Sequence, residues 1–169
     1  MIACFPNSPF NFSAGGGPVS TSYSNTGGSG DRTGLITITQ SNASPVYPFV
    51  NPGILIDGST TGTGSYLRLF CADGEWITFD FGSAKVVDEA RFYQTAARTQ
   101  GTWKFQGSND GSSYTDIGSS FTLGDNLTTQ TITAISGNTT SYRYLRLIKV
   151  SGSTDDTTWT PEIEFKISA

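Results

Sequence analysis

The sequence predicts an all-β fold with many turns. Gly, Ser and Thr make up 65 of the 169 residues, whereas charged residues account for only 14%, compared with about 25% in ordinary soluble domains. Thr, Phe and Tyr, which favour strands, are abundant, and residues that favour helices are scarce. Short alternating segments bounded by turn residues recur along the chain, as in a β-sandwich. This composition argues against a helical bundle, a coiled coil and an α/β enzyme core.

Charge and residue content exclude several functional classes. The net charge is −4 and the isoelectric point is near 4.6, and no run of Lys or Arg is present, so we expect no nucleic-acid partner. No apolar run approaches the ~18 residues of a membrane helix, so we expect no membrane insertion. The absence of histidine removes Ser-His-Asp and Cys-His catalysis and most zinc sites.

The first part of the chain differs from the rest. Residues 1–44 contain the glycine-rich stretches 15–17 and 27–30, which cannot bury enough apolar surface to order themselves. We therefore expect an N-terminal arm at 1–44, docked on another subunit or on a distant part of the fold, followed by one sandwich domain at 45–169. The two cysteines, Cys4 and Cys71, either pair or remain small buried thiols.

The first half of the expected domain gives the clearest strand pattern. Residues 35–39 alternate loosely, and residues 54–56 form a short apolar segment closed by a turn. Residues 75–81 alternate cleanly, with every second residue apolar. A turn at Gly82–Ser83 should separate this strand from the next one, at 86–93.

The second half continues with strands of similar length. The Asn-Asp-Gly sequence at 109–111 predicts a hairpin. The strand at 141–150 is apolar on both faces, so we place it in the middle of a sheet. The remaining strands are expected at 102–107, 114–117, 127–135 (an edge) and 161–167. The core is predicted to consist of Ile77, Phe79, Phe81, Phe92, Phe105, Leu145, Leu147, Ile163 and Phe165.

A series of motifs then suggests a family. In chain order they are Ile-Asp-Gly at 56–58, WITFDFG at 76–82, EARFY at 89–93, WKFQGSNDG at 103–111, YRYLRL at 142–147 and PEIEF at 161–165. Together they resemble the discoidin, or coagulation-factor C-type, domain, a group that includes the family 32 carbohydrate-binding modules. The resemblance covers residues 45–168. It implies an antiparallel jelly-roll β-sandwich of about eight strands.

The resemblance also implies one structural calcium ion. The matching ligand positions are Asp57 and Glu162, and Thr63 can add an oxygen, because calcium prefers six to eight oxygen ligands. The alternative is that Asp57 only caps its turn and Glu162 faces solvent. Two carboxylates brought together repel unless a cation lies between them. We therefore expect either bound calcium or a wide separation of the two carboxylates.

Sugar binding in the resembled family uses loops at one end of the sandwich. The candidate stacking rings here are Trp159, Tyr93, Tyr66 and Phe70, and Arg98 is the candidate partner for sugar hydroxyls. The alternatives are that Trp159 plugs the end of the barrel and that Arg98 is an ordinary solvated charge. The histidine found in many galactose-binding members is missing, which puts galactose specificity in doubt.

The functional hypothesis is a non-catalytic module of an extracellular particle. We expect a bacteriophage virion protein, either a capsid decoration or a tail component, that contacts other subunits through the arm, forms an oligomer and binds surface glycans. Met1 without secretion-signal features and the glycine-rich arm favour this reading. The alternative is a free carbohydrate-binding lectin or an accessory module of a glycoside hydrolase. Glu162 and Glu164 lie two apart, as a catalytic carboxylate pair could, but surface strands often carry such pairs, so we expect no enzyme.

Overall fold

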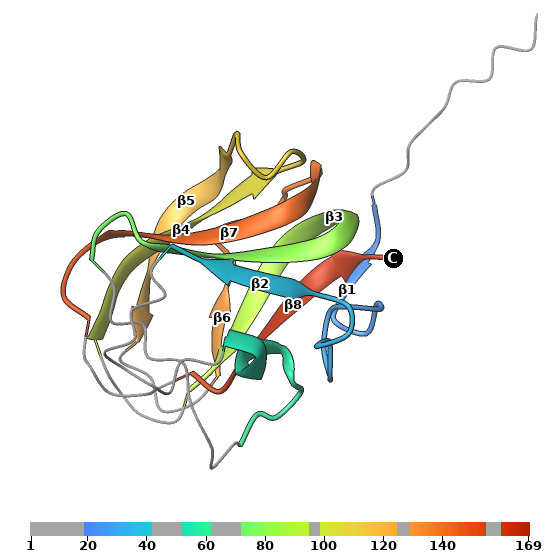
Figure 1. The fold of residues 1–169 in the computed structure, drawn as a ribbon, viewed down its shortest axis with the longest axis horizontal. Helices are drawn as coiled ribbons and strands as arrows, with labels where there is room; N and C mark the ends of the chain where they lie inside the picture. Colours follow the sequence, from blue (N-terminus) through green and yellow to red (C-terminus); the bar gives the residue numbers. More distant parts are fainter. Residues whose placement is uncertain (1–18, 42–51, 62–71, 95–98, 125–128, 155–159) are drawn as a thin grey trace, which may run out of the picture.

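The computed structural model describes residues 19–41, 52–61, 72–94, 99–124, 129–154 and 160–169. These residues form an almost entirely β structure with one short 3₁₀ helix (Figure 1). No helix in these ranges is both long and apolar enough to cross a membrane. The elements are β1 (Thr21–Ser22), β2 (Thr37–Gln40), η1 (Pro52–Ile56), β3 (Trp76–Tyr93), β4 (Thr99–Ser108), β5 (Thr115–Gly124), β6 (Gln130–Ile132), β7 (Ser141–Ser151) and β8 (Glu162–Ser168).

The strands form two layers that share β3. The hydrogen-bonded order is β1-β8-β3-β7-β4-β5, and β2 and β6 also pair with β3, all antiparallel. The first half of β3 pairs with β2 and β7, and its second half pairs with β6 and β8. This arrangement confirms the predicted antiparallel sandwich, with β7 in the interior of its sheet as its apolar pattern indicates (Figure 1).

The core lies between these two layers. All nine residues predicted for it are buried, from Ile77 on β3 to Phe165 on β8. Phe79 and Phe165 meet edge to face with their ring centroids 5.0 Å apart, a geometry that stabilises aromatic pairs. Trp103 is also fully buried, on the same face as Phe105. The alternation of apolar residues therefore located the core correctly.

The turn predicted at Gly82–Ser83 is wrong, because both residues lie within β3. The register with β7 shifts between Asp80 and Lys85, which marks an irregularity in the strand. Gly82 has a φ of 71°, which favours glycine, and its amide donates to Asp80 Oδ1 at 2.8 Å. The chain bends here and passes from one sheet to the other.

Three other segments differ from expectation in length or type. Residues 54–56 belong to η1 rather than to an extended segment. β5 continues to Gly124, well beyond the predicted strand at 114–117. Of the edge or half-exposed strand predicted at 127–135, the described residues 129–135 form only β6, and Thr133 to Gly137 is irregular. Periodicity alone could not set these boundaries.

The described part of the predicted arm packs on the chain's own sandwich. β1 pairs with the end of β8, and β2 pairs with β3 (Figure 1). Between β1 and β2 in the chain, the backbone of Asp31 forms an isolated antiparallel β-bridge with that of Asp57. The predicted boundary at residue 44 lies outside the described residues, as do Cys4 and Cys71. Residues 19–41 thus follow the second alternative, docking on distant parts of the fold.

Candidate functional site

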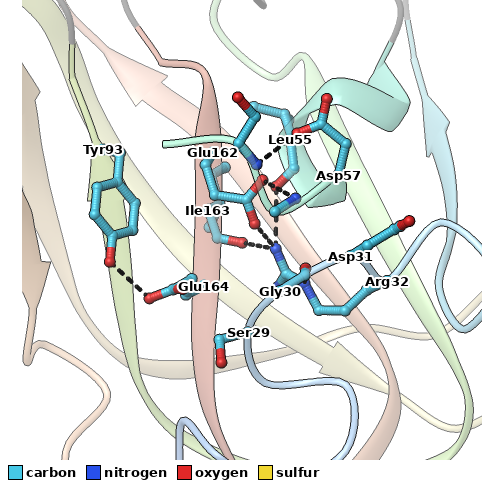
Figure 2. Close-up of polar contacts among 12 residues, drawn as sticks. Ser29, Gly30, Asp31, Arg32, Leu55, Asp57, Tyr93, Glu162, Ile163 and Glu164 are labelled. Atoms are coloured by element: carbon cyan, nitrogen blue, oxygen red, sulfur yellow. Dashed lines mark hydrogen bonds and ion pairs between the residues drawn. The ribbon is translucent and has the colours of Figure 1, made fainter. Parts of the chain in front are cut away.

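The most buried charged contact joins Arg32 to Glu162, the first residue of β8 (Figure 2). Both side chains are fully buried. Arg32 Nη2 donates to Glu162 Oε1, and Glu162 Oε2 accepts the Gly58 amide at 3.0 Å. The contact therefore ties three segments together: the N-terminal segment, the turn after η1 and β8.

Main-chain oxygens complete the surroundings of Arg32. The guanidinium donates to Gly30 O at 3.0 Å, Gly28 O at 3.2 Å and Ile163 O at 2.7 Å, with a longer contact to Leu55 O at 3.4 Å. Four carbonyls and one carboxylate thus surround one cation, as Figure 2 shows in part. Each of the three nitrogens therefore has an acceptor, as a buried guanidinium requires.

Burial dominates the electrostatics of this pair. It raises the pKa of Glu162, although the charge of Arg32 and the Gly58 amide act in the opposite direction. Burial also lowers the pKa of Arg32, and the charge of Glu162 opposes that change. The free-energy cost of burying the two groups is therefore only partly offset by their attraction.

The predicted calcium ligands can be compared with this arrangement. Asp57 and Glu162 do come close in space, as expected, because the amide of Gly58 bonds Glu162. Asp57 is exposed, and its Oδ1 caps its own turn by accepting the Ser59 amide at 2.8 Å. Thr63 lies outside the described residues.

The Arg32 guanidinium lies against Glu162, where the sequence predicts a calcium ion. Calcium bound to Glu162 would have to share that carboxylate with Arg32, so this donor set does not fit the ion. Within the described ranges no cluster of three or more acidic, His or Cys side chains could hold a metal. The calcium ion predicted at Asp57, Glu162 and Thr63 stays a prediction, since Thr63 lies outside the described residues.

Sequence reasoning missed Arg32 as the partner of Glu162. The two residues are 130 positions apart, and no motif connects them. The available signal was that Arg32 is a bulky cation in a segment otherwise rich in Gly, Ser and Thr. Such a residue is a candidate for a buried contact, but its partner cannot be read from the sequence.

Tyr93, a candidate stacking ring, belongs to a second polar network on β3 and β8. Its hydroxyl donates to Glu164 Oε2 at 2.9 Å (Figure 2), and Arg91 contacts the same carboxylate at 3.4 Å. The Arg91 guanidinium also lies over the Tyr23 ring, 4.2 Å from its centroid. Tyr93 is therefore half-buried and already engaged through its hydroxyl.

The other candidate ring and sugar-hydroxyl residues fall outside the described residues: Trp159, Arg98, Tyr66 and Phe70. Three of them can still be placed along the chain relative to the strands. Arg98 lies between β3 and β4, and Trp159 lies between β7 and β8. Tyr66 lies in the connection that leads from η1 to β3. The structure therefore describes the elements that flank these residues but not the residues themselves.

The strand ends beside those connections meet at one edge of the sandwich, which we call the loop end. Tyr93 pairs with Glu162, so β3 finishes where β8 begins. Thr99 pairs with Gly124, and Thr102 pairs with Ser151. The start of β4 therefore lies beside the ends of β5 and β7.

Three buried side chains lie next to these strand ends and carry polar atoms without partners. Gln100 and Thr160 are fully buried, and Gln94 is 8% exposed. Gln94 Oε1, both polar atoms of the Gln100 amide and Thr160 Oγ1 make no hydrogen bond in the structure. Buried polar groups are normally hydrogen-bonded, and leaving one unpaired costs roughly 1–3 kcal/mol. We call these three residues the polar floor.

A well-bonded glutamine adjoins the polar floor and fixes its position. Gln130, at the start of β6, accepts from Gln94 Nε2 at 2.8 Å and from the Gly124 amide at 3.2 Å, and donates to Thr122 O at 2.7 Å. It therefore joins the two sheets at the loop end. No sequence signal distinguished these glutamines from ordinary surface residues.

Comparison with known proteins gives one family match. A family model described as the F5/8 type C domain matches residues 37–161. No curated protein sequence matches the chain.

Solved structures give the same fold at low sequence identity. A Clostridium perfringens module, CpGH89CBM32-5 in complex with GalNAc-β-1,3-galactose, has a TM-score of 0.57 and 16% identity over 81% of this chain and 97% of that one. The family 32 module of C. perfringens NanJ in complex with galactose has a TM-score of 0.60 and 12% identity, covering 81% and 97%. The CBM32 of AlyQ in complex with 4,5-unsaturated mannuronic acid has a TM-score of 0.54 and 24% identity, covering 76% and 92%.

Proposed function

The chain belongs to the F5/8 type C domain family, and from this premise we propose that it is a non-catalytic carbohydrate-binding module that acts outside the cell. Its ligand site is the loop end, above the polar floor. The three similar structures described above are complexes with sugars. Their low identity carries only the fold, so the argument for binding rests on this chain's own residues.

The polar floor is the observation that carries the proposal. Unpaired buried donors and acceptors at Gln94, Gln100 and Thr160 cost free energy that a folded chain rarely tolerates without a purpose. A sugar offers several hydroxyl groups, each able to donate and to accept, and because the floor residues are buried these hydroxyls reach them through bridging water. The mixed donor and acceptor character of the floor suits such a ligand better than an anion or an apolar molecule.

The loop residues predicted from the sequence supply the rest of the site in this proposal. The ring of Trp159, with Tyr66 or Phe70, stacks on the apolar face of a sugar ring, and Arg98 bonds its hydroxyls. Tyr93 has a smaller part, because its hydroxyl is already bound to Glu164.

The test is a glycan microarray with the full chain, followed by titration of the best glycan against single variants. We expect Trp159→Ala and Arg98→Gln each to weaken binding about tenfold or more, because a hydrogen bond to a charged group contributes roughly 1.5–3 kcal/mol. Lys85→Gln, which removes a positive charge from the middle of β3, is the matched control. Equal affinity for all three variants would contradict the proposal.

The virion role and the contact with other subunits through residues 1–44 stay predictions. Residues 19–41 are already engaged by their own sandwich, through β1, β2 and Arg32. A free lectin and an accessory module of a glycoside hydrolase both agree with the proposed binding function.

A further inference from the structure

A second surface stands out on the outer side of the sheet formed by β2, β3, β7, β4 and β5. Cross-strand pairing aligns Thr39, Thr78, Arg146, Gln106 and Asp116 in one row across the five strands. None of these side chains belongs to the core. We call the residues around the centre of this row the sheet-face cluster: Trp76, Thr78, Gln106, Tyr114 and Arg146.

Arg146 is the centre of the cluster. Its Cζ lies 3.5 Å from the centroid of the Tyr114 ring and 5.7 Å from that of Trp76. Its Nε and Nη2 donate to Gln106 Oε1 at 3.0 and 2.8 Å. A guanidinium has five N–H donors in a planar fork, so the edge formed by Nη1 and Nη2 keeps donors with no acceptor among the described residues.

Arg146 also differs from nearly every other cation by having no carboxylate partner. On the same face, Arg143 is bound by Asp80 at 2.8 and 2.9 Å, and Lys104 by Asp116 at 2.6 Å. Elsewhere in the described ranges Arg32, Arg91, Lys149 and Lys166 also form ion pairs. Only Arg146 and Lys85 have none there, in a chain whose net charge is −4.

The surroundings make this unpaired charge costly. Partial removal from water lowers the pKa of Arg146, although the guanidinium stays charged. Thr78, its cross-strand neighbour, is buried, and its hydroxyl has no hydrogen-bond partner. A carboxylate at the open edge of the guanidinium would offset the desolvation of Arg146 through a bidentate, charge-assisted contact.

We propose that the sheet-face cluster is a second glycan-binding surface, specific for uronic-acid units, in which Arg146 binds the sugar carboxylate and the rings of Tyr114 and Trp76 hold the guanidinium in place. This inference rests on the proposed carbohydrate-binding function but uses a different surface from the loop end. The negative net charge of the chain disfavours general attraction of polyanions. Binding of an acidic glycan therefore needs a specific site.

The first experiment varies the ligand and leaves the protein unchanged. Tetragalacturonate and its fully methyl-esterified form are titrated against the full chain at fixed ionic strength. We expect the free acid to bind at least about tenfold more tightly, because esterification removes the charge that Arg146 recognises. Equal affinity for the two forms, or no binding of the free acid, overturns the inference without depending on any variant.

The second experiment locates the site. Arg146→Gln is expected to lower the affinity for tetragalacturonate about tenfold or more, and Arg146→Lys to lower it less, because the charge stays but the planar fork is lost. Lys85→Gln, which removes the other unpaired cation, should leave the affinity unchanged. Thermal unfolding checks that each variant remains folded. An Arg146→Gln variant that binds like Lys85→Gln overturns the proposal.

A loop variant separates this inference from the proposed function. Trp159→Ala should leave tetragalacturonate binding unchanged while it weakens the glycan found on the microarray. If Trp159→Ala alone weakens tetragalacturonate, the acid binds at the loop end, so the proposed function stands and the second surface falls. If only Arg146→Gln has an effect on any glycan, the sheet face stands and the loop-end site falls.

Discussion

At the scale of single residues, Arg32 does for the fold what a bound cation would do. Its guanidinium pairs with Glu162 and donates to four carbonyl oxygens from three segments. Removing one partner of a buried ion pair is far more costly than the net value of the pair, because the other charge stays buried and unpaired. Breaking the contact that holds the N-terminal segment on the sandwich therefore costs a large free energy.

We predict that Arg32→Met lowers the free energy of unfolding by about 3–5 kcal/mol. The matched control is Arg91→Met, which breaks an ion pair with Glu164, the next acidic residue of β8. That pair is longer, at 3.4 Å, and the Arg91 side chain is 34% exposed, so its loss should cost less than about 1 kcal/mol. Urea unfolding measures both, and equal losses would show that the buried pair has no special role.

The same contact leads to an expectation for calcium. Because Arg32 already supplies the positive charge at Glu162, we expect EDTA and millimolar calcium to give the same melting temperature. A higher melting temperature in calcium would support the ion that the sequence predicts at Asp57, Glu162 and Thr63, since a ligand bound only to the folded state stabilises it.

At the scale of elements, alternation and turn chemistry carried most of the sequence-based prediction. Alternation placed Ile77, Phe79 and Phe81 on the buried face of β3, and the structure confirms them. It could not show that β3 continues through Gly82, because a Gly-Ser pair suits both a turn and a bend within a strand. The polar floor, formed by Gln94, Gln100 and Thr160, was not predictable either. Its significance depends on the burial of these side chains, which cannot be read from the sequence.

The hairpin between β4 and β5 gives a pH-dependent prediction. Asp110 accepts the amides of Ser112 and Ser113 at 2.8 and 2.7 Å and the Ser108 hydroxyl at 2.9 Å. These bonds hold the pKa of Asp110 well below its usual value. A lowered pKa contributes stability above the unfolded-state value, near 4, and this stability is lost as the pH falls further.

We therefore expect Asp110→Ala to lower the melting temperature at pH 7 and to differ less from the natural chain as the pH falls below about 4. Thermal unfolding between pH 7 and pH 2 measures the difference. Ser113→Ala is the control, because Ser113 is an exposed residue of the same turn, its amide still bonds Asp110, and its side chain carries no titratable group. A gap between Asp110→Ala and the natural chain that stays constant across this range would contradict the role of the ionised carboxylate.

At the scale of the whole molecule, residues 19–41 of the predicted arm pack on the sandwich. β1 pairs with β8, and β2 pairs with the first part of β3 (Figure 1). Arg32 lies between β1 and β2 in sequence. Glycine-rich composition predicted an arm, because such sequence buries little apolar surface. It gave no warning of the polar contacts that order residues 19–41.

Two truncations test this account of the N-terminal segment. Deleting residues 1–41 removes β1, β2 and Arg32, so we expect a large drop in the melting temperature or failure to fold. Deleting residues 1–18 leaves all of these contacts in place and should preserve the melting temperature. Light scattering coupled to size-exclusion chromatography on the shorter deletion also tests whether residues 1–18 mediate the predicted oligomer.

The central claim is that the loop end binds a carbohydrate above the polar floor, and NMR titration of the ¹⁵N-labelled full chain tests it most directly. With the best glycan from the microarray, we expect the side-chain amide signals of Gln94 and Gln100 to shift in a saturable manner, together with backbone signals from residues 95–98 and 155–159. The Gln106 side chain on the sheet face should not move with a neutral glycan. Unchanged Gln94 and Gln100 signals at saturating glycan would contradict the account.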